Sequence, residues 1–184
     1  MLYFLLLILI YLFQVYDHNY HGRYHSEVGL SNAYKPGETV YYGFAFKIPN
    51  EWQFTDDTMT ILQFIADFNG WEENGLKGKS WSPSTKIWIK GNQLFARIRQ
   101  GSVLEEDNEW FNIADVSKDT WHSVVFGVKW SETTDGWFKL WYDKKLAINR
   151  RDVPTTMKTD NRFNFYTENL TIYIVCYLIS HIYS

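Results

Sequence analysis

The chain has 184 residues and a formal net charge of −3. Its length suits a single domain, and its charge argues against nucleic acid as a partner. Aromatic residues make up 19% of the sequence; they favour strands and offer flat faces on which sugar rings can stack. The single cysteine, Cys176, excludes an internal disulfide. An anionic sugar polymer is not excluded, because a mildly acidic chain can carry a local basic strip.

The chain begins with an unbroken apolar run at Leu2–Phe13. This run is shorter than an ordinary membrane-spanning helix and matches the apolar part of a secretory signal. No Lys or Arg precedes it, and no clear small-residue cleavage site follows it. We expect a signal peptide or an aberrant start over residues 1–15, a secreted protein and no stable membrane span. A membrane anchor and a mis-assigned chain start are the alternatives.

Alternating or strongly β-prone segments, separated by turn signals, follow along the chain. They predict strands at His21–Leu30, Thr39–Ile48, Thr60–Phe68, Lys86–Lys90, Leu94–Gln100, Trp121–Trp130 and Trp137–Tyr142. A loop is expected at Asn69–Ser84, and a hairpin with a type I′-like Asp135-Gly136 inside a longer loop. The sequence therefore predicts one all-β domain over residues 16–168, folded as a sandwich or jelly roll.

The last residues, 169–184, are apolar and aromatic and end without a turn. They are too few and too polar for a membrane helix. Asn169-Leu170-Thr171 is a glycosylation sequon, which has meaning only in a secreted chain. We expect an atypical C-terminal tail here, either a strand or translated non-coding sequence.

Four segments, in this order, resemble the polysaccharide lyase group that contains glucuronan lyase and heparin-lyase-I-like proteins: GRYHSEV, YYGFAFKIPNEW, ILQFIADF and TWHSVVFGVKWSETTDGWFKLWYDKKL. The similarity covers roughly residues 20–165. The resemblance implies a concanavalin-like jelly roll of two antiparallel sheets, with a substrate groove on the concave face. It also implies β-elimination on a uronic-acid polysaccharide, glucuronan being the closest substrate class, without a required cofactor.

Alginate-lyase relatives of this group share an Arg-x-Glu strand, a Gln-x-His strand and a late strand that carries a tyrosine acid. Here His25 stands in place of that Arg, two residues before Glu27, and Ile65 stands in place of that His, two residues after Gln63. Both changes favour the glucuronan branch. The match fades where the late strand is expected, after about residue 165, so that Tyr173 is a candidate for the acid within an atypical tail.

β-Elimination needs a neutralised uronate carboxylate, a base for the C5 proton and an acid for the departing O4. Gln63 can donate its amide to the carboxylate, and an unpaired buried amide would cost about 1–3 kcal/mol. His25 can act as the base or as a partner of the carboxylate, since imidazole titrates near neutral pH. We therefore expect His25, Gln63 and Tyr173 to be catalytic. The alternative for Gln63 is a structural amide satisfied by a neighbouring strand.

Arg97 and Arg99 alternate onto one strand face, where guanidinium groups could grip uronate carboxylates near Gln63. Ordinary surface charge is the alternative. Weaker candidates complete the predicted substrate-binding set: Arg23, Glu27 and Lys139, the last of which could equally face solvent on the outer sheet.

Asp56 and Asp57 make calcium a candidate structural ion, and His122 is expected to be structural. An acidic polysaccharide is the expected partner of a monomeric chain. Two other classes stay open: a non-catalytic, lectin-like carbohydrate-binding domain and a laminarinase-type hydrolase. The hydrolase needs carboxylates spaced along one strand, whereas Glu105-Glu106-Asp107 is expected to lie in a loop.

Overall fold

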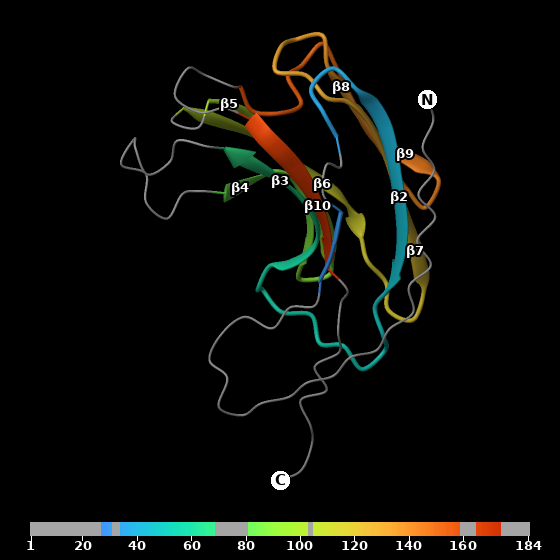
Figure 1. Ribbon diagram of the computed structural model, residues 1–184. Helices are drawn as coiled ribbons and strands as arrows, with labels where there is room; N and C mark the ends of the chain where they lie inside the picture. The colour runs from blue at the N-terminus through green and yellow to red at the C-terminus, as the bar shows by residue number, and fades with distance from the viewer. Residues whose placement is uncertain (1–26, 31–33, 69–80, 103–104, 159–164, 174–184) are drawn as a thin grey trace, which may run out of the picture.

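The structure is a computed structural model that describes residues 27–30, 34–68, 81–102, 105–158 and 165–173. At 27–30, 65–68, 81–84, 106 and 165–173 the description covers the backbone alone. Two antiparallel sheets face each other (Figure 1). The larger has the order β1 (Glu27–Leu30), β10 (Phe165–Tyr173), β3 (Met59–Phe68), β4 (Trp81–Lys90), β5 (Gln93–Gly101) and β6 (Glu106–Asp115). The smaller has the order β2 (Thr39–Lys47), β7 (Trp121–Lys129), β8 (Trp137–Tyr142) and β9 (Lys145–Arg151). The predicted all-β sandwich is confirmed.

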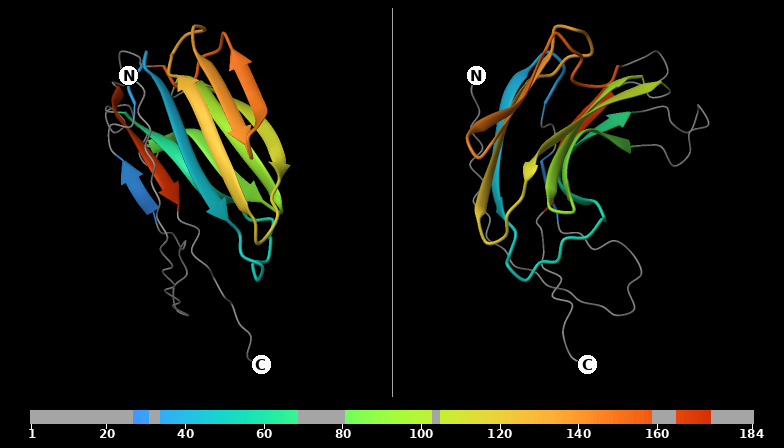
Figure 2. Two further views of the ribbon diagram at one scale, coloured as in Figure 1. Left: turned by 90° about the vertical axis from the view of Figure 1, so that its right-hand side faces the viewer. Right: turned by 180° about the vertical axis from the view of Figure 1, so that it is seen from behind.

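One apolar core fills the space between the sheets. Fully buried side chains reach it from both layers, among them Phe64, Ile87 and Leu94 from the larger sheet and Phe126 and Phe138 from the smaller one. Because side chains alternate across a strand, the residues between these core positions point away from the core. The larger sheet bends so that its outward side is hollow (Figure 2).

Trp130 is the centre of the aromatic packing in this core. Its ring is fully buried and stacks on Tyr34 with centroids 3.6 Å apart. Phe64 meets it edge-on at 5.0 Å, and its indole N–H donates to the Tyr42 hydroxyl at 3.2 Å. Trp130, the last residue of the predicted strand Trp121–Trp130, therefore makes a large part of the contact between the two sheets.

Two strands that the sequence did not predict, β6 and β9, lie at the edges of their sheets. Both are rich in polar and charged residues, as edge strands often are, so that their alternation is weak. The prediction of a loop at Glu105-Glu106-Asp107 is wrong for its last two residues, which begin β6. The loop expected at Asn69–Ser84 is wrong at its end, since β4 begins at Trp81. β10 runs through the boundary that we expected between residues 168 and 169.

The expected type I′-like turn at Asp135-Gly136 is also wrong. Positive φ angles occur one hairpin later, at Asp143 (46°) and Lys144 (67°), which join β8 to β9 as a two-residue turn. Neither Asp135 nor Gly136 has a positive φ angle. Asp135 accepts a hydrogen bond from the Thr133 hydroxyl at 2.8 Å, within the longer loop that the sequence predicted. The Asp-Gly signal marked the chain reversal but not the turn type.

His122 in β7 is buried and hydrogen-bonded on both ring nitrogens. Its Nδ1 lies 2.8 Å from the Asp143 carboxylate and 2.7 Å from the Tyr142 hydroxyl, and its Nε2 lies 3.0 Å from the Ser117 carbonyl oxygen. The Asp143 carboxylate also accepts the Ser123 backbone N–H at 2.7 Å. This network ties the β8–β9 turn to β7, which agrees with a structural role for His122.

Replacing Asp143 by asparagine should destabilise the fold at neutral pH by about 1 kcal/mol, a value kept small because the carboxylate is 40% exposed. Burial by itself would raise the pKa of Asp143, but the hydrogen bonds from His122 and Ser123 outweigh it and leave this pKa lowered. A carboxyl group with a lowered folded-state pKa stabilises the protein above its unfolded pKa of about 3.9 and loses this contribution as pH falls through the folded value. Urea unfolding of both proteins at pH 7 and at pH 3 should therefore show a difference that shrinks in acid. An equal difference at both pH values would contradict the interpretation.

Candidate active-site groove

A row of four residues crosses the hollow side of the larger sheet. Gln63 in β3 pairs with Lys86 in β4, Lys86 pairs with Arg97 in β5, and Arg97 pairs with Trp110 in β6. These positions alternate with buried core positions, so that all four belong to the outward side of the sheet. Side chains directly opposite each other on paired strands have Cβ atoms within about 4.5–5.5 Å. An amide, two cations and an indole therefore form a continuous stripe.

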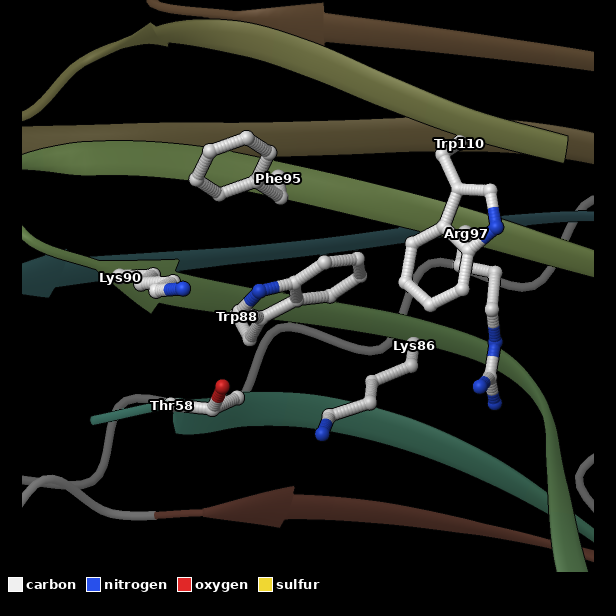
Figure 3. A pocket seen from close by; sticks show the side chains of 7 residues that line it. All are labelled: Thr58, Lys86, Trp88, Lys90, Phe95, Arg97 and Trp110. Atoms are coloured by element: carbon white, nitrogen blue, oxygen red, sulfur yellow. The ribbon is translucent and has the colours of Figure 1, made fainter. Parts of the chain in front are cut away.

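A groove of about 470 Å³ lies beside this stripe (Figure 3). Its lining combines aromatic rings with cations: Thr58, Lys86, Trp88, Lys90, Phe95, Arg97 and Trp110. Pockets of several hundred Å³ suit ligands of small-molecule size, including a few sugar units. The lining holds three cations and no carboxylate, so its local potential attracts anions although the whole chain is acidic.

The aromatic part of the groove is a packed group with one exposed member. Trp88 stacks on Phe95 at 5.5 Å with an interplanar angle of 15°, and meets Trp110 edge-on at 5.4 Å. Trp88 is 7% exposed, whereas Trp110 is 60% exposed. Trp110 therefore offers a supported ring to a ligand in the groove.

The cations are held against these rings. The Lys86 ammonium lies 5.6 Å from the Trp88 centroid, and the Arg97 guanidinium carbon lies 5.5 Å from the Trp110 centroid, within the range of cation–π attraction. Figure 3 shows both side chains extending from their own strands toward β3. Arg97 is 8% exposed, and a charge in such a water-poor place acts strongly on an anionic ligand.

Gln63 occupies the end of the row and is 5% exposed. On its other side it pairs with Thr171 in β10, and Tyr173, two residues further along β10, pairs with Glu27 in β1. The backbone register thus brings three predicted site residues, Gln63, Tyr173 and Glu27, to neighbouring positions of three adjacent strands. Strand β10 separates β1 from β3. His25 and Arg23 lie outside the described residues.

The predicted arginines have different places. Arg97 lines the groove, but β4 separates it from Gln63, so that Lys86 is the cross-strand neighbour of Gln63. Arg99 is not among the groove residues, and its Nε donates to Asn108 Oδ1 at 3.1 Å. Lys86 was missed, although the alternation of Lys86, Trp88 and Lys90 in a predicted strand was a signal that could have found it.

The prediction of Lys139 as a residue of the same groove is wrong. Lys139 lies in β8 of the smaller sheet, where its ammonium is 5.7 Å from the Trp137 centroid. Nothing in the strand alternation could tell which sheet would receive this segment. The alternative made for it from sequence, a place on the outer side of the other sheet, is the observed one.

The acidic residues of strand β6 do not support the hydrolase interpretation. Glu109 forms an ion pair with Arg150 of the smaller sheet at 2.7 Å, and Asp107 is exposed on the edge strand. Asp56 and Asp57 are exposed in a loop, and the described residues contain no group of three or more His, Cys, Asp or Glu that could hold a metal ion. Calcium stays a prediction.

A jelly-roll sandwich with a basic, aromatic groove on its larger sheet suits a domain that acts on polysaccharides. The chain belongs to the polysaccharide lyase family, whose model matches residues 9–167. No curated protein sequence matches the chain. Within the described part of the chain, no helix has the length and apolar character of a membrane span.

The solved structure of one enzyme agrees with this family. A crystal structure of endo-β-1,4-glucuronan lyase from the fungus Trichoderma reesei is 37% identical, with a TM-score of 0.72, over 84% of this chain and 65% of that chain. This chain thus spans less than two thirds of the length of that enzyme. A pentraxin from Limulus polyphemus (13% identity, TM-score 0.38, 73% of this chain and 50% of that one) and alginate lyase AlyC3 (8%, 0.33, 71% and 71%) are more distant.

Proposed function

We propose that this protein cleaves a glucuronan-like uronic-acid polymer by β-elimination in the groove of its larger sheet. One observation carries the proposal: Gln63, Lys86, Arg97 and Trp110 form an unbroken row on one side of one sheet. An amide and two cations suit a carboxylate, and an exposed indole suits the apolar face of a sugar ring. The similarity to the fungal glucuronan lyase supports the choice of polymer.

In the proposed reaction, Gln63 and Lys86 bind the uronate carboxylate and neutralise its negative charge, which makes the C5 proton more acidic. A base, for which we propose His25, takes this proton. The C5–H electron pair forms the C4–C5 double bond, and the C4–O4 bond breaks. Tyr173 gives its proton to the departing O4. Glu27, paired with Tyr173 in register, is proposed to assist in binding. The reaction consumes no cofactor.

The apolar run at Leu2–Phe13 supports secretion as part of this proposal.

The direct test is the ultraviolet absorbance of the unsaturated uronate that β-elimination creates. The purified chain should raise this absorbance with glucuronan, and less with alginate or heparin. If none of the three polymers gives a rise while glucuronan still binds, the groove is that of a lectin-like domain and the lyase proposal fails.

Arg97→Met should lower kcat/KM for glucuronan by about 10–100-fold, because it removes a cation held in a water-poor part of the groove. Arg99→Met is the matched control: it removes the same charge from the same strand, but this arginine is bound to Asn108 and does not line the groove. Its activity should stay within a few-fold of the wild-type value. Steady-state rates at low and moderate salt measure both. Equal losses in the two variants would mean that only the overall charge matters.

A further inference from the structure

The outer side of the smaller sheet carries exposed apolar side chains on the far side of the sandwich from the groove. The described residues include five large apolar side chains that are exposed, and four of them lie here: Tyr41, Trp121, Val125 and Leu146. The left view of Figure 2 looks onto this sheet. A cluster of exposed apolar side chains marks an interaction site more often than scattered ones do.

The centre of this surface is built around a glycine. Tyr41 in β2 and Trp137 in β8 reach over Gly127 in β7, with ring centroids 6.0 Å apart. A Cβ atom at Gly127 would lie 2.5 Å from a Tyr41 ring atom and 3.1 Å from a Trp137 ring atom. The absence of a side chain at this position therefore lets two rings from flanking strands lie low on the sheet. Tyr41 is 37% exposed.

Two cations stand beside these rings. Lys139 pairs with Gly127 in register and extends over Trp137, and Arg151 pairs with Trp137. Neither side chain forms a hydrogen bond or an ion pair with any residue that the structure describes. Nearby cations differ: Lys47 is bound to Asp119, and Lys129 to Asp135. We call the set Tyr41, Gly127, Trp137, Lys139 and Arg151 the outer platform; it holds two cations and no carboxylate.

We infer that the outer platform is a second, non-catalytic binding site for an anionic polysaccharide. Its two rings, tilted by 54° to each other, each offer a face to the apolar side of a sugar ring, and its two cations fit carboxylates on successive units of the polymer. A second copy of the chain fits less well. In a two-fold dimer the same surface of each subunit faces the other. Lys139 and Arg151 of one copy would then lie near Lys139 and Arg151 of the other, which costs free energy through like-charge repulsion.

The function of such a site follows from its position. A polymer bound on the outer platform cannot reach the groove at the same time with the same segment, because the core separates the two sheets. The platform would instead hold the protein on a long chain or on a gel-like mass of polymer, which raises the local concentration of cleavable segments at the groove. The identity of the polymer as glucuronan-like rests on the proposed function.

The experiment is affinity electrophoresis in gels that contain glucuronan, with a neutral β-1,4-glucan as the comparison polymer. Arg97→Met/Trp110→Ala serves as the groove-disabled background. This protein should still be retarded by glucuronan. Adding Tyr41→Ala/Lys139→Met should lower its affinity for glucuronan, measured from the retardation, about tenfold. In the otherwise intact protein, Tyr41→Ala/Lys139→Met should leave turnover of short oligosaccharides unchanged and reduce turnover of the long polymer.

A second variant guards against misfolding of the first. Gly127→Ala keeps both rings but displaces that of Tyr41, so it should weaken retardation in the same direction while thermal unfolding stays cooperative. The inference is overturned if the groove-disabled protein is not retarded although the intact protein releases unsaturated product. It is also overturned if the neutral glucan retards it equally, or if the platform variants change only the oligomeric state. If the groove-disabled protein is retarded but the intact protein yields no unsaturated product, the platform stands and the proposed lyase function fails.

Discussion

Gln63→Ala is expected to lower kcat for glucuronan by about 10²–10³-fold, the usual effect of removing one donor that stabilises developing charge. Gln63 is buried at the end of the groove row, and its amide can donate to the uronate carboxylate without adding a charge of its own. The appearance of unsaturated product under saturating substrate measures the effect. Because the amide acts on the reacting sugar, the loss should fall on kcat rather than on KM.

Gln93→Ala is the control for this experiment. Gln93 begins β5 in the same sheet, but its side chain contacts Asp115 and Asn112 rather than the groove. Its replacement should leave turnover within a few-fold of the wild-type value. Circular dichroism and urea unfolding should show that Gln63→Ala still folds. A variant that unfolds would instead make Gln63 the structural amide that the sequence left as the alternative.

Trp130→Ala should destabilise the fold by about 3–5 kcal/mol, as is typical when a large buried aromatic side chain is removed. The ring is fully buried, stacks on Tyr34 at 3.6 Å and donates its N–H to Tyr42. Its loss leaves a cavity between the two sheets and an unfilled acceptor beside it. Chemical denaturation at neutral pH measures the change in the free energy of unfolding.

Trp121→Ala provides the matched comparison, since it removes the same side chain from a position that is 62% exposed. Its effect should stay within about 0.5 kcal/mol. Similar losses in the two variants would show that the burial of Trp130 between the sheets is not what stabilises the sandwich.

Local patterns predicted much of the fold. Thr39–Lys47, Trp121–Lys129 and Trp137–Tyr142 were found as strands because they are rich in β-branched and aromatic residues between turn signals. This composition can be recognised without knowledge of the partner strand. Strands β6 and β9 were missed because edge strands carry polar residues on both sides. The family, too, was evident from four segments in order, and the family match confirms it.

The site was predicted in part. Gln63 was identified as a polar residue in an apolar strand, and Arg97 by its alternation with Arg99 onto one strand face, and both signals are present in the sequence itself. The spatial arrangement of these two residues was not predicted from the sequence, because it depends on strand β4, which lies between β3 and β5 and supplies Lys86. Trp110 was missed together with its strand.

By itself, then, the sequence determined which segments become strands, which of their residues avoid the core and which family the chain belongs to, since each of these depends on neighbours in the chain. Tertiary structure alone decided the order of the strands. It placed β10 between β1 and β3, so that the position of Tyr173 lies near that of Gln63. It also sent Arg97 and Lys139, two basic residues of similar local pattern, to opposite sides of the sandwich. The physical reason is that strand pairing joins residues far apart in sequence, and alternation fixes the side of a strand but not the sheet that receives it.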